Sequence, residues 1–302
     1  MKATTVCRAL VLGISLGAST ALWARPDPGQ KMDTSLLGRS DLAYSFSEFE
    51  VDSADHRRHY RIWVGLPRAA APKAGYPVLY MLDGNAAIAA FDPARLQALN
   101  QGAAPVLVGL GYATPLRIDR EGRTFDYTPQ RTKGPQLDPL TQLESGGAEV
   151  FLTLVRDVIK PRVNGLAHLN LRQQGLWGHS YAGLLTTYTL LRHPQDFQYY
   201  AAASPSLWWD PSAVARNQRG LAQRLEGTSV RLLTLRGSEE GASPRRAATG
   251  SPKAAQTLTE ALARRYGVHA RYQEFPGLSH GPMLEASLKY TLDWFSQQTA
   301  AK

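Results

Sequence analysis

The chain has 302 residues, of which 43% are hydrophobic and 20% charged, and its net charge is +9. This length allows a large buried core without covalent staples, and the one cysteine, Cys7, excludes an intramolecular disulfide. The basic residues are scattered without a nucleic-acid-binding motif, so the charge favours a small anionic ligand over a polymer.

Residues 1–24 have the pattern of a secretory signal peptide. A basic start precedes an apolar run over residues 9–18, which is short for a membrane span, and small residues follow. We expect cleavage after Ala24 and export of a cysteine-free mature chain. An uncleaved N-terminal anchor is the alternative, because Leu22 is an imperfect residue at position −3 of that cleavage site.

Strands and helices alternate along the rest of the chain. Segments 43–51 and 60–66 alternate apolar and polar residues, as half-buried antiparallel strands do. Further strands, several of them continuous apolar runs typical of strands covered on both faces, are expected at 77–82, 105–110, 174–177, 230–235 and 270–275, and helices at 149–160, 181–192, 254–266 and 284–295. This order predicts one α/β domain over residues 25–302, with a mainly parallel central sheet flanked by helices and antiparallel N-terminal strands.

Residues 116–147 interrupt this alternation with a long polar stretch that has no clear periodicity. Segments of this kind in compact domains are usually functional lids or disordered. Because the stretch follows a central strand, we expect a lid over the strand ends. It is locally basic, as is segment 241–253, and both would suit an anionic ligand.

Ser180 lies in the sequence Gly-His-Ser-Tyr-Ala, between a buried strand and a helix. This is the setting of a nucleophile elbow, where small residues flank the serine because the turn is tight. Ala182 stands in place of the usual second glycine, with Gly183 one position later. An ordinary strand-to-helix junction is the alternative, but the order of the remaining catalytic parts favours a nucleophile.

His280 is the histidine best placed to act as the general base. It follows the last predicted strand and precedes the last helix, and in an α/β-hydrolase fold the acid and then the histidine follow the serine along the chain. The acid is expected after strand 230–235, where Glu240 is preferred over Glu239, and a site without an acid is the alternative. The backbone N–H groups of Tyr181 and Gly84 are expected to form the oxyanion hole.

With these residues in place, the chain resembles the periplasmic siderophore esterases, the α/β-hydrolases that open the trilactone of enterobactin and salmochelin. The matching stretches are VLYMLDGNA (78–86), RTFDYTP (123–129), GLWGHSYAGL (175–184), YYAAASPSLWW (199–209) and FPGLSHGPMLEAS (275–287). The resemblance implies Ser180 as nucleophile and His280 as base. In these relatives the acid position varies and some have only the serine and histidine, so Glu240 is the least constrained assignment.

The resemblance also implies Arg123 as a contact to the anionic ligand. The alternative is an arginine paired with Glu121 or Asp126. Trp208, together with Trp209, could line the site against aromatic rings or could pack in the core near the nucleophile.

The predicted function is that of an exported, periplasmic serine esterase that hydrolyses a catecholate siderophore, enterobactin-like and in its ferric form, to release iron. The alternatives are a periplasmic carboxylesterase of other substrates, such as feruloyl or acetyl esters, and a catalytically silent siderophore-binding protein. No cofactor, no resident metal and no nucleic-acid partner is implied, and no stable membrane insertion is expected after signal cleavage.

Overall fold

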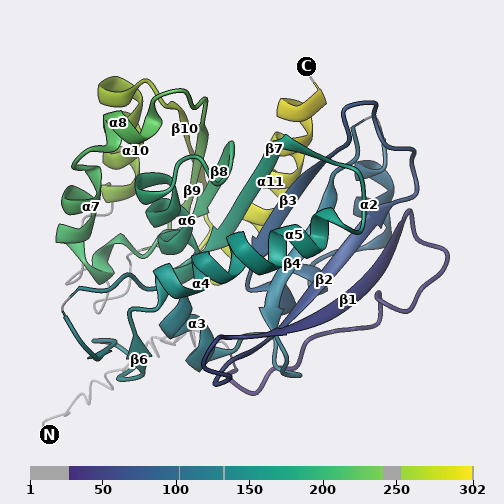
Figure 1. The fold of residues 1–302 in the computed structure, drawn as a ribbon, viewed down its shortest axis with the longest axis horizontal. Helices are drawn as coiled ribbons and strands as arrows, with labels where there is room; N and C mark the ends of the chain where they lie inside the picture. Colours follow the sequence, from purple (N-terminus) through teal and green to yellow (C-terminus); the bar gives the residue numbers. More distant parts are fainter. Residues whose placement is uncertain (1–26, 102, 132, 241–252, 301–302) are drawn as a thin grey trace, which may run out of the picture.

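The computed structural model describes residues 27–101, 103–131, 133–240 and 253–300. The expected signal peptide, with Cys7, and most of the basic segment 241–253 lie outside these ranges. At the centre of the described part is an eight-stranded sheet with the order β1-β2-β4-β3-β7-β8-β9-β10 (Figure 1). Its strands are β1 (Tyr44–Asp52), β2 (His59–Pro67), β3 (Tyr76–Leu82), β4 (Val106–Tyr112), β7 (Leu169–His179), β8 (Tyr199–Ala203), β9 (Arg231–Gly237) and β10 (His269–Phe275).

The sheet is antiparallel at its N-terminal side and parallel elsewhere. Strand β2 pairs antiparallel with β1 and β4, and the pairs from β4 through β10 are parallel. This is the α/β-hydrolase arrangement that the sequence predicts. The register aligns the carboxyl ends of neighbouring strands, for example His179 with Ala203. Residues that directly follow these strands therefore meet at one edge of the sheet.

Helices cover both faces of the sheet. Along β3 the side chains of Val78 and Tyr80 enter one core and those of Leu79 and Met81 enter the other, as the alternation of a strand requires. The first core receives α4 (Ala148–Leu154), the π-helical turn η1 (Val155–Ile159), α5 (Lys160–Asn164), α6 (Tyr181–Arg192), α8 (Leu221–Leu225) and α10 (Ala254–Tyr266). The second core receives α1 (Gly84–Ala89), α2 (Pro93–Leu99) and α11 (Met283–Ala300).

Within the described ranges, no helix has both the length and the apolar character that a membrane crossing needs. The helix predicted at 149–160 is three consecutive segments, α4, η1 and α5, and Pro161 near the start of α5 lacks the N–H that a continuous helix would use. Strand β8 was not predicted from the sequence. It is nevertheless buried along its whole length between β7 and β9.

Candidate active site

Ser180 occupies a strained turn between β7 and α6. Strand β7 ends at His179, α6 begins at Tyr181, and Ser180 between them has φ 66° and ψ −116°. Positive φ is uncommon for a residue with a side chain and is characteristic of sites where the surrounding structure enforces a conformation. The sharp turn holds Ser180 at the carboxyl end of a central strand.

The neighbouring small residues explain why Ala182 is accepted in this turn. A Cβ at Gly178 would lie 2.4 Å from the Ala182 carbonyl oxygen, and a Cβ at Gly183 would lie 2.5 Å from the Ala203 oxygen. Both positions therefore require glycine. The methyl group of Ala182 itself is buried, in space that Gly178 leaves open.

Ser180, His280 and Glu240 are brought together by the ends of three strands. His280 follows β10, and its Nε2 lies 2.9 Å from Ser180 Oγ. Glu240 follows β9, and its Oε2 lies 3.3 Å from His280 Nδ1. The histidine side chain is 21% exposed and the glutamate side chain 7%. This geometry can pass the serine proton to His280 while the carboxylate orients the ring.

Glu240 is held in place by further hydrogen bonds. Its Oε1 accepts from Ser204 Oγ at 2.5 Å and from the Gly237 N–H at 2.9 Å. Burial disfavours the charged carboxylate, but the hydrogen bonds and the charge of His280 outweigh it, so the pKa of Glu240 lies below its usual value. Glu239, the other candidate acid, is exposed, and its carboxylate accepts from Ser238 Oγ at 3.3 Å.

The two predicted oxyanion donors are the first residues of two helices. Gly84 begins α1 and Tyr181 begins α6, and the first N–H groups of a helix have no partner within it. A Cβ at Gly84 would lie 2.6 Å from the Gly109 carbonyl carbon of β4, so this close approach requires glycine. The preceding residue, Asp83, is left-handed with φ 51°. Both N–H groups thus belong to a residue that directly follows a sharp backbone turn at the end of a central strand.

Arg123 connects these two turns. Its Nε and Nη2 each donate to a different carboxylate oxygen of Asp83 at 2.9 Å, and Nη2 lies 3.5 Å from the His179 carbonyl oxygen. Burial would lower the pKa of Arg123, but the Asp83 charge raises it overall. The ion-pair partner is thus neither Glu121 nor Asp126, the two alternatives considered from the sequence. Asp83 occupies two of the guanidinium donors, and contact of Arg123 with a ligand remains a prediction.

The two tryptophans after β8 are placed differently from each other. Trp208 is partly exposed, and its ring centroid lies 6.0 Å from that of Tyr181. Trp209 is buried, and its Nε1 donates to Asp138 Oδ2 at 2.5 Å. Ser206, two residues before Trp208, brings its Oγ to 3.5 Å from Ser180 Oγ. Of the pair, only Trp208 can present its ring toward solvent at the site.

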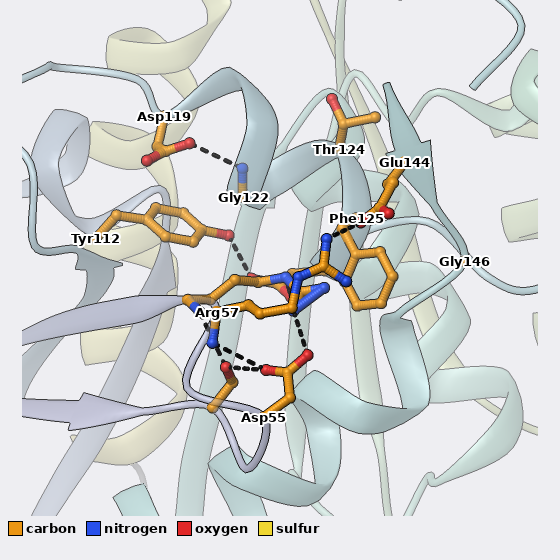
Figure 2. Close-up of polar contacts among 12 residues, drawn as sticks. Asp55, Arg57, Tyr112, Asp119, Gly122, Thr124, Phe125, Glu144 and Gly146 are labelled. Carbon is orange, nitrogen blue, oxygen red and sulfur yellow. Dashed lines mark hydrogen bonds and ion pairs between the residues drawn. The ribbon is translucent and has the colours of Figure 1, made fainter. Parts of the chain in front are cut away.

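Segment 116–147, expected as a lid, contains regular structure. It includes α3 (Arg120–Asp126) and a small hairpin of β5 (Gln136–Leu137) and β6 (Glu144–Ser145). Figure 2 shows how it is attached to the turn between β1 and β2, where Arg57 donates to Glu144 at 3.0 Å.

A second attachment joins α3 to the end of β4. The hydroxyl of Tyr112 donates to Asp126 Oδ2 at 2.8 Å, and Asp119 caps the start of α3 by accepting from the Gly122 N–H at 2.8 Å (Figure 2). The described residues of segment 116–147 are therefore held against the rest of the chain at several points, and a role as a lid remains a prediction.

Sequence reasoning missed three residues that contact the site: Asp83, Asp138 and Ser206. Asp83 and Ser206 lie inside the matching stretches VLYMLDGNA and YYAAASPSLWW, so their proximity to Gly84 and Trp208 was a usable signal. Asp138 lies in a polar stretch where an aspartate before proline is typical of a turn. Nothing local marks its contacts with residues far along the chain.

Comparison with known proteins identifies relatives of this chain. The sequence model of an esterase family, described as "Putative esterase", matches residues 53–291. The apo-salmochelin esterase of Escherichia coli O6:H1 (strain CFT073) is 34% identical over 283 residues, covering 92% of this chain and 87% of that protein. The ferri-bacillibactin esterase BesA of Bacillus subtilis (strain 168) is 29% identical over 256 residues, covering 80% of this chain and 88% of that protein.

A solved structure, the enterobactin and salmochelin hydrolase IroE, superposes with a TM-score of 0.68 at 33% sequence identity. The superposition covers 87% of this chain and 99% of that one. The match therefore extends over nearly the whole related structure. Residues 53–291, which match the esterase family, include Ser180, Glu240 and His280. The chain belongs to this esterase family and is a carboxylic ester hydrolase.

Proposed function

We propose that this esterase hydrolyses the trilactone ester bonds of a catecholate siderophore of the enterobactin type, in its ferric form, and thereby releases iron in the periplasm. The observation that carries the proposal is the Ser180–His280 contact of 2.9 Å, in a chain 34% identical to an apo-salmochelin esterase over 92% of its length.

In the proposed mechanism Ser180 Oγ attacks an ester carbonyl while His280 Nε2 takes the serine proton. Glu240 accepts a hydrogen bond from His280 Nδ1 and stabilises the imidazolium that forms. The N–H groups of Gly84 and Tyr181 receive the developing oxyanion. The C–O bond to the leaving alkoxide then breaks, and His280 returns the proton to that oxygen, which leaves an ester of Ser180.

Water completes the cycle. His280 removes a proton from the water molecule, the resulting hydroxide attacks the acyl carbon, and the carbon–oxygen bond to Ser180 breaks as the serine regains its proton. One ester is thereby converted to an acid and an alcohol. Each hydrolysis opens or shortens the trilactone, and a linear ligand holds iron less tightly because its three catecholates are less preorganised.

Electrostatics support an anionic substrate. A ferric tris-catecholate carries a charge of about −3, which the chain attracts at long range, since its net charge of +9 stays positive after loss of Lys2 and Arg8 with residues 1–24. Arg120 and Arg131 are exposed on segment 116–147, which we expect to act as a lid over the strand ends. Export is proposed from the pattern of residues 1–24, and N-terminal sequencing of protein recovered from a periplasmic fraction tests it.

The decisive experiment compares substrates on the purified protein. Ferric enterobactin, iron-free enterobactin, a feruloyl ester and p-nitrophenyl acetate are supplied separately, and mass spectrometry identifies the products. We expect linear products from ferric enterobactin with the highest kcat/KM. Preference for the feruloyl ester would favour a general carboxylesterase, and tight siderophore binding without any linear product would favour a binding protein.

Ser180→Ala is the matched variant for this experiment. We expect it to abolish hydrolysis of every ester while siderophore affinity stays within about tenfold of wild type, because Oγ attacks the ligand without being needed to hold it. His280→Ala should be nearly as damaging, since the serine then lacks a base. A Ser180→Ala protein that opens the trilactone at the wild-type rate would contradict the assignment.

A further inference from the structure

Asp138 is a fully buried carboxylate in the turn between β5 and β6, and it joins this turn to two segments of the active site. It is 0% exposed. Its Oδ1 accepts from the N–H groups of Leu140 and Thr141 at 3.0 and 2.7 Å and from Thr141 Oγ1 at 2.9 Å. These bonds aim the other oxygen, Oδ2, away from the turn.

Oδ2 accepts two hydrogen bonds from residues distant in sequence. The hydroxyl of Tyr181 donates at 2.9 Å and Nε1 of Trp209 donates at 2.5 Å. Tyr181 directly follows the nucleophile and carries a predicted oxyanion donor. Trp209 ends the short helical turn Leu207–Trp209 after β8. Its backbone N–H donates to the Ser206 carbonyl oxygen at 3.0 Å.

That short segment is itself in contact with Ser180. The Ser206 N–H donates to the Ser180 carbonyl oxygen at 3.1 Å, and the two hydroxyl oxygens are 3.5 Å apart. The Tyr181 ring also packs near Trp208 and lies 5.4 Å from the Arg123 guanidinium carbon. One carboxylate thus holds the residue after the nucleophile and the segment that buttresses the nucleophile's backbone.

The chemistry of the two partners requires an acceptor here. The indole N–H can only donate, and the Tyr181 hydroxyl donates to the same oxygen. An asparagine would offer one amide oxygen in place of two carboxylate oxygens, and its NH₂ group would face donors. Burial opposes ionisation of Asp138, but the hydrogen bonds from Thr141, Trp209 and Tyr181 outweigh it, so its pKa lies below the usual value.

We propose that Asp138 is a positioning residue for ester hydrolysis: it fixes the side chains of Tyr181 and Trp209 and thereby the Tyr181 N–H and the backbone around Ser180. Segment 116–147 is then a structural part of the catalytic centre in addition to any contact it makes with a ligand. The inference rests on the proposed role of Ser180 as nucleophile, and it is independent of which ester is the natural substrate.

The test measures the chemical step per active site on p-nitrophenyl acetate, for wild type, Asp138→Asn, Tyr181→Phe, Trp209→Phe and the double variant Asp138→Asn/Tyr181→Phe. Active sites are counted by complete phosphorylation of the serine with diisopropyl fluorophosphate, which releases one fluoride for each Ser180 that reacts. Glu144→Gln is the matched control, because it removes an acid from the same segment, one whose carboxylate accepts from Arg57 in the β1–β2 turn.

We expect Asp138→Asn to lower kcat per titrated site by about 10- to 100-fold while KM stays within about twofold, as a small misplacement of an oxyanion donor does. Tyr181→Phe should lower kcat by about threefold to tenfold. The double variant should be no worse than Asp138→Asn alone, because both changes remove the same hydrogen bond. Glu144→Gln should behave as wild type.

A purely structural role would give a different result. In that case Asp138→Asn would lower the number of titratable sites or the melting temperature, while kcat per site stayed within about twofold of wild type, and this would overturn the proposal. Multiplicative losses in the double variant would overturn it as well. If Asp138→Asn does not fold, Tyr181→Phe and Trp209→Phe each remove one donor to Oδ2, and unchanged kcat per site in both would refute the inference. Failure to cleave ferric enterobactin would bear only on the proposed substrate.

Discussion

The carboxylate of Glu240 is placed to orient His280, and we expect it to do so. It contacts Nδ1 at 3.3 Å, and it is anchored by Ser204 and the Gly237 N–H, so the ring cannot rotate freely. We expect Glu240→Gln to lower kcat by about 10²- to 10⁴-fold, because the amide favours the wrong tautomer and does not stabilise the imidazolium. Glu239→Gln is the matched control and should retain wild-type kcat. Similar kcat values for the two variants would remove the acid from the mechanism.

For Arg123 the question is whether it holds the turn before Gly84 or contacts a ligand, since Asp83 already occupies two of its donors. If the ion pair serves mainly to hold the turn that carries Gly84, Arg123→Lys should reduce kcat about tenfold on neutral and anionic esters alike, because lysine cannot form the two-pronged contact. Arg120→Lys, on the exposed side of the same helix, is the control. A rise in KM confined to ferric enterobactin would instead favour a direct ligand contact.

At the scale of an element, helix α3 is attached through a buried carboxyl group. Burial raises the pKa of Asp126 to about 7, against the opposing effects of Tyr112 and Arg58. The folded protein therefore keeps a proton on this carboxyl group at pH values where the unfolded chain, with a pKa of about 3.9, has already lost it. The contribution to stability is full below about pH 4 and is lost as pH rises through about 7.

Asp126→Asn should remove this pH dependence. Thermal unfolding measured from about pH 5 to pH 8 should show the variant gaining stability relative to wild type as pH rises. Glu121→Gln, an exposed acid on the same helix, should leave the wild-type profile unchanged. A constant difference between Asp126→Asn and wild type over this range would mean that Asp126 does not change protonation there.

The elements that the sequence predicted correctly are those with a strong apolar pattern of their own. Strands β3, β4 and β9 are continuous apolar runs, and such runs are distinctive in a sheet covered on both faces. Strand β8 escaped prediction because Tyr199–Ala203 is short and ends in three alanines, which have low strand propensity. Helix α3 escaped because its seven residues depend on a cap at Asp119 and on tertiary contacts.

The residues of the site likewise fall into those that the sequence could predict and those that it could not. Ser180 and His280 could be placed because chain order and strand ends constrain them in this fold. The partners of Arg123 and Asp138 could not be placed, since they depend on how segment 116–147 packs against the rest of the chain. Asp138 lies 43 residues from Tyr181 and 71 from Trp209. No periodicity in the sequence encodes contacts at such separations.

At the scale of the whole molecule, the reacting atoms come from distant parts of the chain. Ser180 and His280 are separated by 100 residues, and the four parallel strands from β7 to β10 must pair in register before the two side chains meet. Closing so large a loop is slow compared with helix formation. After dilution from denaturant, recovery of esterase activity should therefore lag behind the helical circular dichroism signal at 222 nm. Simultaneous recovery of both signals would argue against this order.

The same separation in sequence bears on when, during folding, the catalytic centre becomes active. In a partly folded chain in which β10 has not yet paired, Ser180 would lack the contact with His280, so we expect Ser180 to be unreactive until β10 pairs with β9. Proteins of this size commonly fold through populated intermediates. We therefore expect esterase activity to appear late in folding, so that labelling of Ser180 by an organophosphate counts the fully folded molecules.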